Sequence, residues 1–302
     1  SLTGQPNAMG GREVGGLANQ LAAHMDIDNP VHRHRVQRFW SSPVMAARAG
    51  LKAVDLFEAV HEGRVKAVWV MATNPVVSLP NADRVRAALQ KCDLVVVSDC
   101  IGDTDTTRMA HVKLPALGWG EKDGTVTNSE RRISRQRAFL PTPGEARPDW
   151  WIISEVGRRM GYADAFAYAS PAAIFREHAA LSAFENDEAH GVRDFDISGL
   201  MALSDAAYDE LEPVQWPVSP RQPGGRQRLF ADGRFFTPDA RGRFLAVSAR
   251  APVNLPEAAY PLVLNTGRIR DQWHTMTRTG LTERLLAHIG EPFCAMHPED
   301  AA

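Results

Sequence analysis

One short stretch of the sequence, residues 264–279, concentrates side chains that could bind an anion. It has the sequence LNTGRIRDQWHTMTRT, in which three arginines stand among threonine, asparagine and glutamine donors. Arginine forks grip phosphate oxygens bidentately, and Gly267 lets backbone N–H groups approach a ligand closely. Charge runs are usually solvated, but Trp273 and His274 are residue types that are often partly buried. The stretch therefore favours a loop that holds an anionic, phosphate-bearing ligand, with a solvated loop as the alternative.

The elements around this stretch are expected to be β-rich. The apolar run AAYPLVL, residues 258–264, leads into it and predicts a buried strand. Upstream, the Pro/Gly-rich segment VQWPVSPRQPGG, residues 214–225, is typical of a linker or a domain boundary. The β-like runs RLFA and RFLAVS follow that segment, so the tail differs in class from the front of the chain.

The front of the chain has the pattern of an α/β domain. Residues 65–71, VKAVWVM, and residues 93–99, DLVVVSD, are apolar runs typical of strands that a parallel sheet buries on both faces. Residues 81–91 have the periodicity of an amphipathic helix between them, which completes a βαβ unit. Residues 45–61 and 14–25 predict further helices. The fold class is therefore α/β with a mostly parallel sheet.

Short polar side chains follow both predicted strands. Thr73 and Asn74 come after the first strand, and Ser98 and Asp99 end the second. Ligands of open α/β sheets bind at the carboxyl ends of the strands, so these residues are expected to share one crevice. The same residue types are also preferred helix N-caps, and that alternative stays open for either pair.

Other candidate residues lie in glycine-rich or basic segments. Arg12 stands in the glycine-rich start of the chain, which lacks GxGxxG and is either a flexible or a ligand-facing loop. Lys122 precedes Asp123-Gly124 and is either a turn lysine or a phosphate contact. The arginines of residues 128–137 are expected to form mostly a solvated face. A helix opens at Asp149, directly after a proline.

Composition excludes several classes of function. The 302 residues are 44% hydrophobic and 23% charged with a net charge of −2, so neither nucleic-acid nor membrane binding is expected. A membrane helix needs about 20 apolar residues in a row, and no apolar run approaches that length. The three cysteines contain no CxxC pair, so no metal site is expected within the chain and reduced, cytoplasmic thiols are the default. Cys92 and Cys100 are expected to be core residues.

Five segments together resemble the molybdopterin oxidoreductases of the bis-(molybdopterin guanine dinucleotide) family, above all its assimilatory, nitrate-reducing catalytic subunits. The segments are SLTGQPNAMGGREVGG, MATNPVVSLPNAD, VVSD, GWGEKDGTVTNSERRISRQRAFLPTPGEARPDWW and LNTGRIRDQWHTMTRTG. The segments containing NSERR and TGR…WHT are specific to this group in combination, whereas each alone would be a weak signal.

The resemblance implies an internal fragment of a longer catalytic subunit. Residues 1–212 would be the second half of a discontinuous, doubly wound α/β cofactor-binding domain. Residues 213–257 would be a linker, and residues 258–302 would begin the β-barrel that caps the cofactor. The family's N-terminal cysteine motif for a [4Fe–4S] cluster and the segment with the molybdenum-ligating cysteine are absent from this sequence. The isolated fragment is therefore expected to be inactive.

The resemblance also implies roles for individual residues. Arg12 would stand at the substrate funnel as the catalytic cation that attracts and polarises nitrate. An aspartate such as Asp149 would accept paired N–H groups from a guanine edge. The cofactor-binding residues would be Asn74, Ser98, Asp99, Lys122, Asp149, Thr266, Gly267, Arg268, Ile269, Arg270, Asp271, Gln272, Trp273, His274 and Thr275.

The function that the resemblance implies is reduction of nitrate to nitrite by oxygen-atom transfer at Mo-bis(molybdopterin guanine dinucleotide). Electrons would come from a donor protein or reductase subunit through the [4Fe–4S] cluster, and the cofactor would carry the chemistry. A formate-dehydrogenase-like member and a cofactor-less structural relative are alternatives. A nicotinamide dehydrogenase is disfavoured, because no GxGxxG follows a predicted strand.

Overall fold

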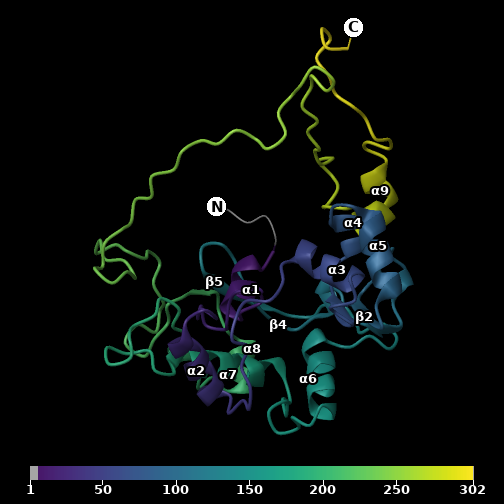
Figure 1. The fold of residues 1–302 in the computed structure, drawn as a ribbon. Coiled ribbons are helices and arrows are strands. Elements are labelled where there is room, and N and C mark those ends of the chain that lie inside the picture. Colours follow the sequence, from purple (N-terminus) through teal and green to yellow (C-terminus); the bar gives the residue numbers. More distant parts are fainter. Residues whose placement is uncertain (1–5, 302) are drawn as a thin grey trace.

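The computed structural model describes residues 6–301, which form two small sheets with helices around them (Figure 1). The strands are β1 (Ala67–Met71), β2 (Leu94–Asp99), β3 (Val112–Pro115), β4 (Gly124–Thr127), β5 (Arg132–Gln136) and β6 (Val214–Gln215). The α-helices are α1 (Ala8–Glu13), α2 (Pro30–Phe39), α3 (Ala53–His61), α4 (Pro75–Ser78), α5 (Ala82–Lys91), α6 (Asp149–Arg159), α7 (Pro171–Ala183), α8 (Asp205–Asp209) and α9 (Glu283–Leu286).

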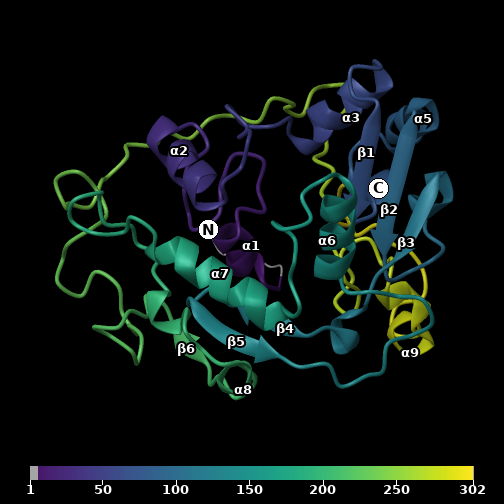
Figure 2. The same ribbon diagram turned by 90° about the horizontal axis from the view of Figure 1, so that it is seen from below.

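The first sheet is parallel, in the order β1-β2-β3, which confirms the α/β class. Its strands are rich in valine, whose branched side chain packs well on a pleated surface. Met71 at the end of β1 is paired with Ser98, so both strands end at the same edge of the sheet. Val70, Val95 and Val97 pack with α3 and α5 in one apolar cluster. Figure 2 shows α3 and α5 beside this sheet and the second sheet apart from it.

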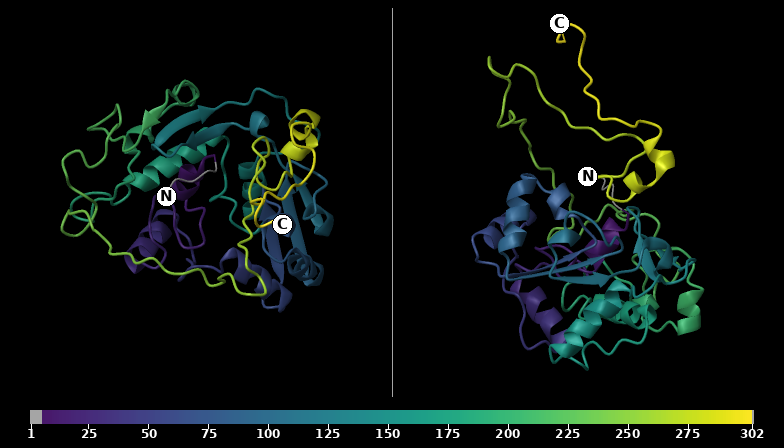
Figure 3. Two further views of the ribbon diagram at one scale, coloured as in Figure 1. Left: turned by 90° about the horizontal axis from the view of Figure 1, so that it is seen from above. Right: turned by 90° about the vertical axis from the view of Figure 1, so that its right-hand side faces the viewer.

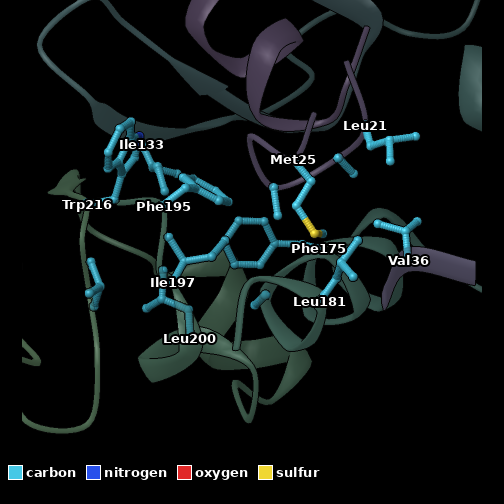
Figure 4. Packing of buried hydrophobic residues seen from close by; sticks show 14 of the residues in the cluster. Leu21, Met25, Val36, Ile133, Phe175, Leu181, Phe195, Ile197, Leu200 and Trp216 are labelled. Carbon is cyan, nitrogen blue, oxygen red and sulfur yellow. The ribbon is translucent and has the colours of Figure 1, made fainter. Parts of the chain in front are cut away.

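The second sheet is antiparallel, in the order β4-β5-β6, and covers the larger apolar cluster. Figure 4 shows that cluster, in which Phe175 of α7 lies among side chains from the turn after α1 and from residues 195–218. Trp216 and Val218 are buried in it, although they lie in the segment that the sequence indicates as a linker. The boundaries 1–212, 213–257 and 258–302 themselves stay a prediction.

Several predicted elements differ from the structure. The helix expected over residues 45–61 begins only at Ala53. Residues 45–52 are irregular and include Gly50, a residue type that disfavours helix. Residues 14–25 form turns instead of a helix, and the helix lies earlier, at α1 in the glycine-rich segment. The side chain of Arg135 is 3% exposed and not solvated, because its guanidinium stacks 4.1 Å from the ring centroid of Tyr208.

The tail of the chain holds no strand of the expected barrel within the residues that the structure describes. The strand expected at residues 258–264 is wrong: Leu264 is 87% exposed and the segment is irregular. A strand needs a partner for its backbone groups, and none pairs with this segment beyond one bridge from Glu257 to Tyr260. Figure 3 shows the green-to-yellow chain extending away from the sheets and returning to them near α9. Across residues 6–301, none of the helices has the length and apolar character needed to cross a membrane.

Candidate functional site

A crevice lies at the carboxyl edge of the parallel sheet. Its volume is about 620 Å³, and Asn74 and Asp99 line it from the ends of β1 and β2. The prediction that these two strand ends share one crevice is therefore confirmed. Lys122, Asp149 and the stretch 264–279 also contribute, so segments that lie far apart in the sequence converge there.

Asn74 is the buried link between the sheet and the distant stretch. Its Oδ1 accepts a hydrogen bond from the Thr106 hydroxyl at 2.6 Å, and its Nδ2 donates to Thr277 Oγ1 at 3.2 Å. Although Asn74 precedes α4, its side chain makes no capping hydrogen bond. Asn74 therefore occupies the N-cap position of α4, where its backbone C=O accepts the N–H groups of Val77 and Ser78, but its side chain bonds Thr106 and Thr277 and does not cap the helix. The Asp99 carboxylate accepts the backbone N–H of Ile101 at 3.0 Å, which closes a local turn at the rim.

Lys122 and Asp149 form an ion pair in the wall of the crevice, with Nζ 2.5 Å from Oδ2. The two side chains are 31% and 27% exposed, so solvent screens the pair only in part. Oδ1 of Asp149 is buried and has no hydrogen-bond partner among the described residues. An unpaired buried acceptor costs about 1–3 kcal/mol, which a ligand donating an N–H group would relieve.

The stretch 264–279 enters the crevice only with its second half. Trp273, His274 and Thr275 line the crevice, whereas Gln272 is buried and does not line it; Gln272 accepts a hydrogen bond from Thr279 Oγ1 at 2.7 Å. Outside the crevice lining are Thr266, Gly267, Arg268, Ile269, Arg270 and Asp271.

Three of those outer residues, Arg268, Arg270 and Asp271, already have partners in the chain. The Arg268 guanidinium lies 5.7 Å from the ring centroid of Trp273. The Asp271 carboxylate pairs with Arg270 at 3.2 Å and with the His288 ring, and the Arg270 guanidinium chiefly holds the pKa of Asp271 below its ordinary value. These contacts hold the loop together within itself.

Two further predicted site residues, Ser98 and Arg12, also do not line the crevice. Ser98 is fully buried, and its hydroxyl accepts a hydrogen bond from the indole N–H of Trp69 at 2.8 Å. Arg12 is exposed on α1 and does not line the crevice. The neighbouring Glu13 is buried, with its carboxylate bound by Thr127 at 2.8 Å and Trp216 at 2.6 Å, so α1 is anchored to the second sheet.

Four residues line the crevice that do not stand among the predicted cofactor-binding residues: Cys100, Trp119, Thr277 and Arg278. Cys100 follows Asp99 directly and is only half-buried, so its expected core position is wrong; burial still raises the pKa of its thiol. Thr277 and Arg278 stand in the polar stretch itself, which was the available signal for them. Nothing in the sequence distinguishes Trp119 from other tryptophans. No cluster of three His, Cys, Asp or Glu side chains in residues 6–301 could hold a metal ion.

Comparison with models of known protein families identifies the family of the chain. Residues 4–159 match the model described as "Molybdopterin oxidoreductase", which is more than half of the chain. The chain belongs to the molybdopterin oxidoreductase family. Residues 262–302 also match the model described as "Molydopterin dinucleotide binding domain". The resemblance seen in the sequence motifs is therefore confirmed.

Among relatives of this oxidoreductase chain are two proteins named nitrate reductase. The one from Klebsiella oxytoca is 55% identical over 100% of this chain and 34% of its own length. The one from Shewanella frigidimarina is 50% identical over 98% of this chain and 32% of its own length. The F420-dependent formate dehydrogenase subunit alpha of Methanocaldococcus jannaschii is 32% identical over 99% of this chain and 41% of its own length. The chain thus spans about a third of the nitrate reductases that it matches.

The crevice of this molybdopterin oxidoreductase chain has the chemistry that a pterin dinucleotide requires. Lys122 and Arg278 are cations suited to phosphate oxygens. The unpaired Oδ1 of Asp149 is suited to an N–H group of a guanine edge. Trp119 and Trp273 are 62% and 42% exposed in the same crevice, where a flat ring could stack on them. The residues present therefore fit the cofactor class of the family.

Proposed function

We propose that the chain forms part of the catalytic subunit of a molybdenum-dependent nitrate reductase, which reduces nitrate to nitrite. The observation that carries the proposal is the gradation in identity. Over nearly the whole chain, two nitrate reductases are 55% and 50% identical, whereas a formate dehydrogenase subunit is 32% identical. The formate-dehydrogenase-like alternative is therefore less favoured. An assay with formate as the substrate distinguishes it from the proposal.

The crevice residues would hold Mo-bis(molybdopterin guanine dinucleotide). When bound, this cofactor supplies the two-electron exchange that removes one oxygen atom from nitrate. Asp149 would accept guanine N–H groups, and Lys122 would orient Asp149 while facing the phosphates. Asn74 would hold the stretch 264–279 in place over the ligand through its hydrogen bond to Thr277. Residues 266–275 of that stretch would contact the cofactor. Ser98 would act indirectly, through Trp69.

Arg12 would serve the substrate rather than the dinucleotide. It forms no ion pair within the described residues and lies on the anchored helix α1, so its charge is free to attract nitrate. A [4Fe–4S] cluster outside this chain and an electron-donor protein or reductase subunit would deliver the electrons. We place the enzyme in the cytoplasm, which agrees with the free thiols of all three cysteines.

The test is an activity assay on the intact subunit that contains this chain. Reduced viologen dye should be oxidised when nitrate is added, and nitrite should accumulate in step. Formate-dependent dye reduction with no response to nitrate would instead identify the alternative function. In the same assay, Arg12→Ala should lower kcat/KM for nitrate by about 30–150-fold, because a preorganised charge contributes about 2–3 kcal/mol. The exposed Arg48 provides the control substitution Arg48→Ala.

A further inference from the structure

A second cavity lies apart from the crevice, between the end of α2, helix α7 and the loop that joins α6 to α7. Its volume is about 710 Å³, and none of its lining residues lines the crevice. Five aromatic side chains form much of its wall: Phe39, Trp40, Tyr162, Phe166 and Tyr168. Cavities of about 300–1,000 Å³ with aromatic walls and a few polar groups are typical of small-molecule sites.

The cavity carries negative charge that no basic lining residue balances. Glu177 of α7 and Asp164 line it, whereas no lysine or arginine does. The nearby Arg176 points elsewhere and pairs with Asp205 at 2.7 Å. The Glu177 carboxylate accepts hydrogen bonds from the Trp40 indole N–H at 3.0 Å and the Tyr168 hydroxyl at 2.7 Å. Two aromatic rings therefore hold an anionic group in the wall of the cavity.

His178, which follows Glu177 on α7, also lines this cavity. Its Nε2 is buried and has no hydrogen-bond partner among the described residues, while its ring lies 5.3 Å from that of Phe195. Burial lowers the pKa of His178 to about 4, so the ring is neutral at pH 7 and does not repel a cation.

The aromatic wall is fixed by packing before any ligand arrives. Phe166 lies against Gly157 of α6, where a Cβ atom would stand only 2.6 Å from the ring. Its ring meets that of Tyr168 edge-on at a centroid distance of 6.5 Å. Helix α7 begins at Pro171, and the Ser170 hydroxyl caps it by accepting the Ala173 N–H at 3.3 Å. This cap fixes the start of the helix that carries Glu177.

We propose that this cavity binds a primary alkylammonium ion, with its charge between the Glu177 carboxylate and the aromatic rings. A cation over the face of a tryptophan or tyrosine is attracted by the ring quadrupole, and the attraction grows as water is excluded. The N–H groups of the ammonium ion donate to the free lone pairs of Glu177. The apolar stem of the ligand packs against Phe39 and Phe166. This site is independent of the proposed nitrate reductase activity.

Calorimetric titration of the intact subunit that contains this chain, at low salt, compares n-butylammonium with 1-butanol, which has nearly the same shape and no charge. Butylammonium should bind at least about tenfold more tightly, which corresponds to about 1.4 kcal/mol. Glu177→Gln should reduce butylammonium binding to the level of the alcohol, since glutamine still accepts from Trp40 but carries no charge. Equal binding of amine and alcohol to the parental chain would overturn the proposal.

Matched variants separate this site from general attraction to an acidic surface. Glu210→Gln changes an exposed acid outside the cavity and should leave binding unchanged. An equal loss with Glu210→Gln and Glu177→Gln would overturn the proposal. Asp164→Asn changes an exposed acid of the lining and should weaken binding even if Glu177→Gln fails to fold. Tetramethylammonium, which has no N–H donor, should bind more weakly than butylammonium; tighter binding would overturn the assignment of Glu177 as the acceptor of the ammonium N–H groups.

Discussion

Arg268 and Arg278 belong to the same polar stretch but have different surroundings. Arg278 lines the crevice and makes no ion pair within the described residues, whereas the Arg268 guanidinium stacks on Trp273 outside it. Removing a charged hydrogen-bond donor from an anionic ligand costs about 1.5–3 kcal/mol, or about tenfold to a hundredfold in affinity. In the intact enzyme, Arg278→Ala should therefore lower molybdenum per chain after dialysis. Elemental analysis showing an equal or larger loss with Arg268→Ala would reverse this assignment.

His178 should make stability depend on pH. Its pKa is 6.5 when unperturbed and about 4 in the folded chain, because burial disfavours the charged ring. Between these values the unfolded state binds a proton that the folded state rejects, so the free energy of unfolding falls as pH drops from about 6.5 to about 4. The loss from this group is at most about 3 kcal/mol.

Urea unfolding at pH 7 and pH 4.5 measures that contribution. His178→Gln removes the titrating ring, so its free energy of unfolding should fall less over this interval than that of the parental chain. His34→Gln, at an exposed position on α2, should retain the full pH dependence. Identical pH dependence in the parental chain and His178→Gln would show that His178 titrates normally in the folded state.

At the scale of elements, the stretch 264–279 docks onto the sheet edge through few polar contacts. The hydrogen bond from Asn74 to Thr277 is the direct one to the end of β1. Thr277→Val keeps the shape of the side chain and removes the acceptor, which costs about 1 kcal/mol or about fivefold in local opening. Amide hydrogen exchange in residues 272–279 should accelerate accordingly. Thr282→Val, where the hydroxyl caps nothing, is the control, and equal exchange in both variants would remove Thr277 as the anchor.

The elements that the sequence predicts correctly are those determined by local pattern. Strands β1 and β2 follow from continuous valine-rich runs, and α5 follows from its amphipathic periodicity. The run at residues 258–264 has the same local pattern but no pairing partner in the described chain, so it stays exposed. Local pattern therefore predicts a strand only where tertiary structure supplies its neighbour.

At the scale of the whole molecule, the site is only partly predictable, because its residues come together through tertiary structure. Asn74 and Asp99 could be paired in advance, because parallel strands end at one edge of a sheet. Lys122 stood out in the sequence as either a turn lysine or a phosphate contact, and the binding role of Asp149 came from the family resemblance. Only the fold shows that the two form an ion pair with one carboxylate oxygen unused. Trp119 depends on how the segment after β3 turns back to the crevice, which no local pattern encodes.

The crevice as the binding place of the dinucleotide is the central claim, and Asp149 tests it most directly. Asp149→Asn keeps the shape of the side chain but removes its charge and one acceptor, next to the cation of Lys122. The intact enzyme is purified and hydrolysed in acid, and the released guanosine monophosphate and molybdenum are measured per chain. Both should fall about tenfold or more relative to the parental enzyme, while Asp83→Asn, at a side chain that is 94% exposed, should leave both unchanged. Parental levels of guanine nucleotide and molybdenum in Asp149→Asn would contradict the assignment of the crevice.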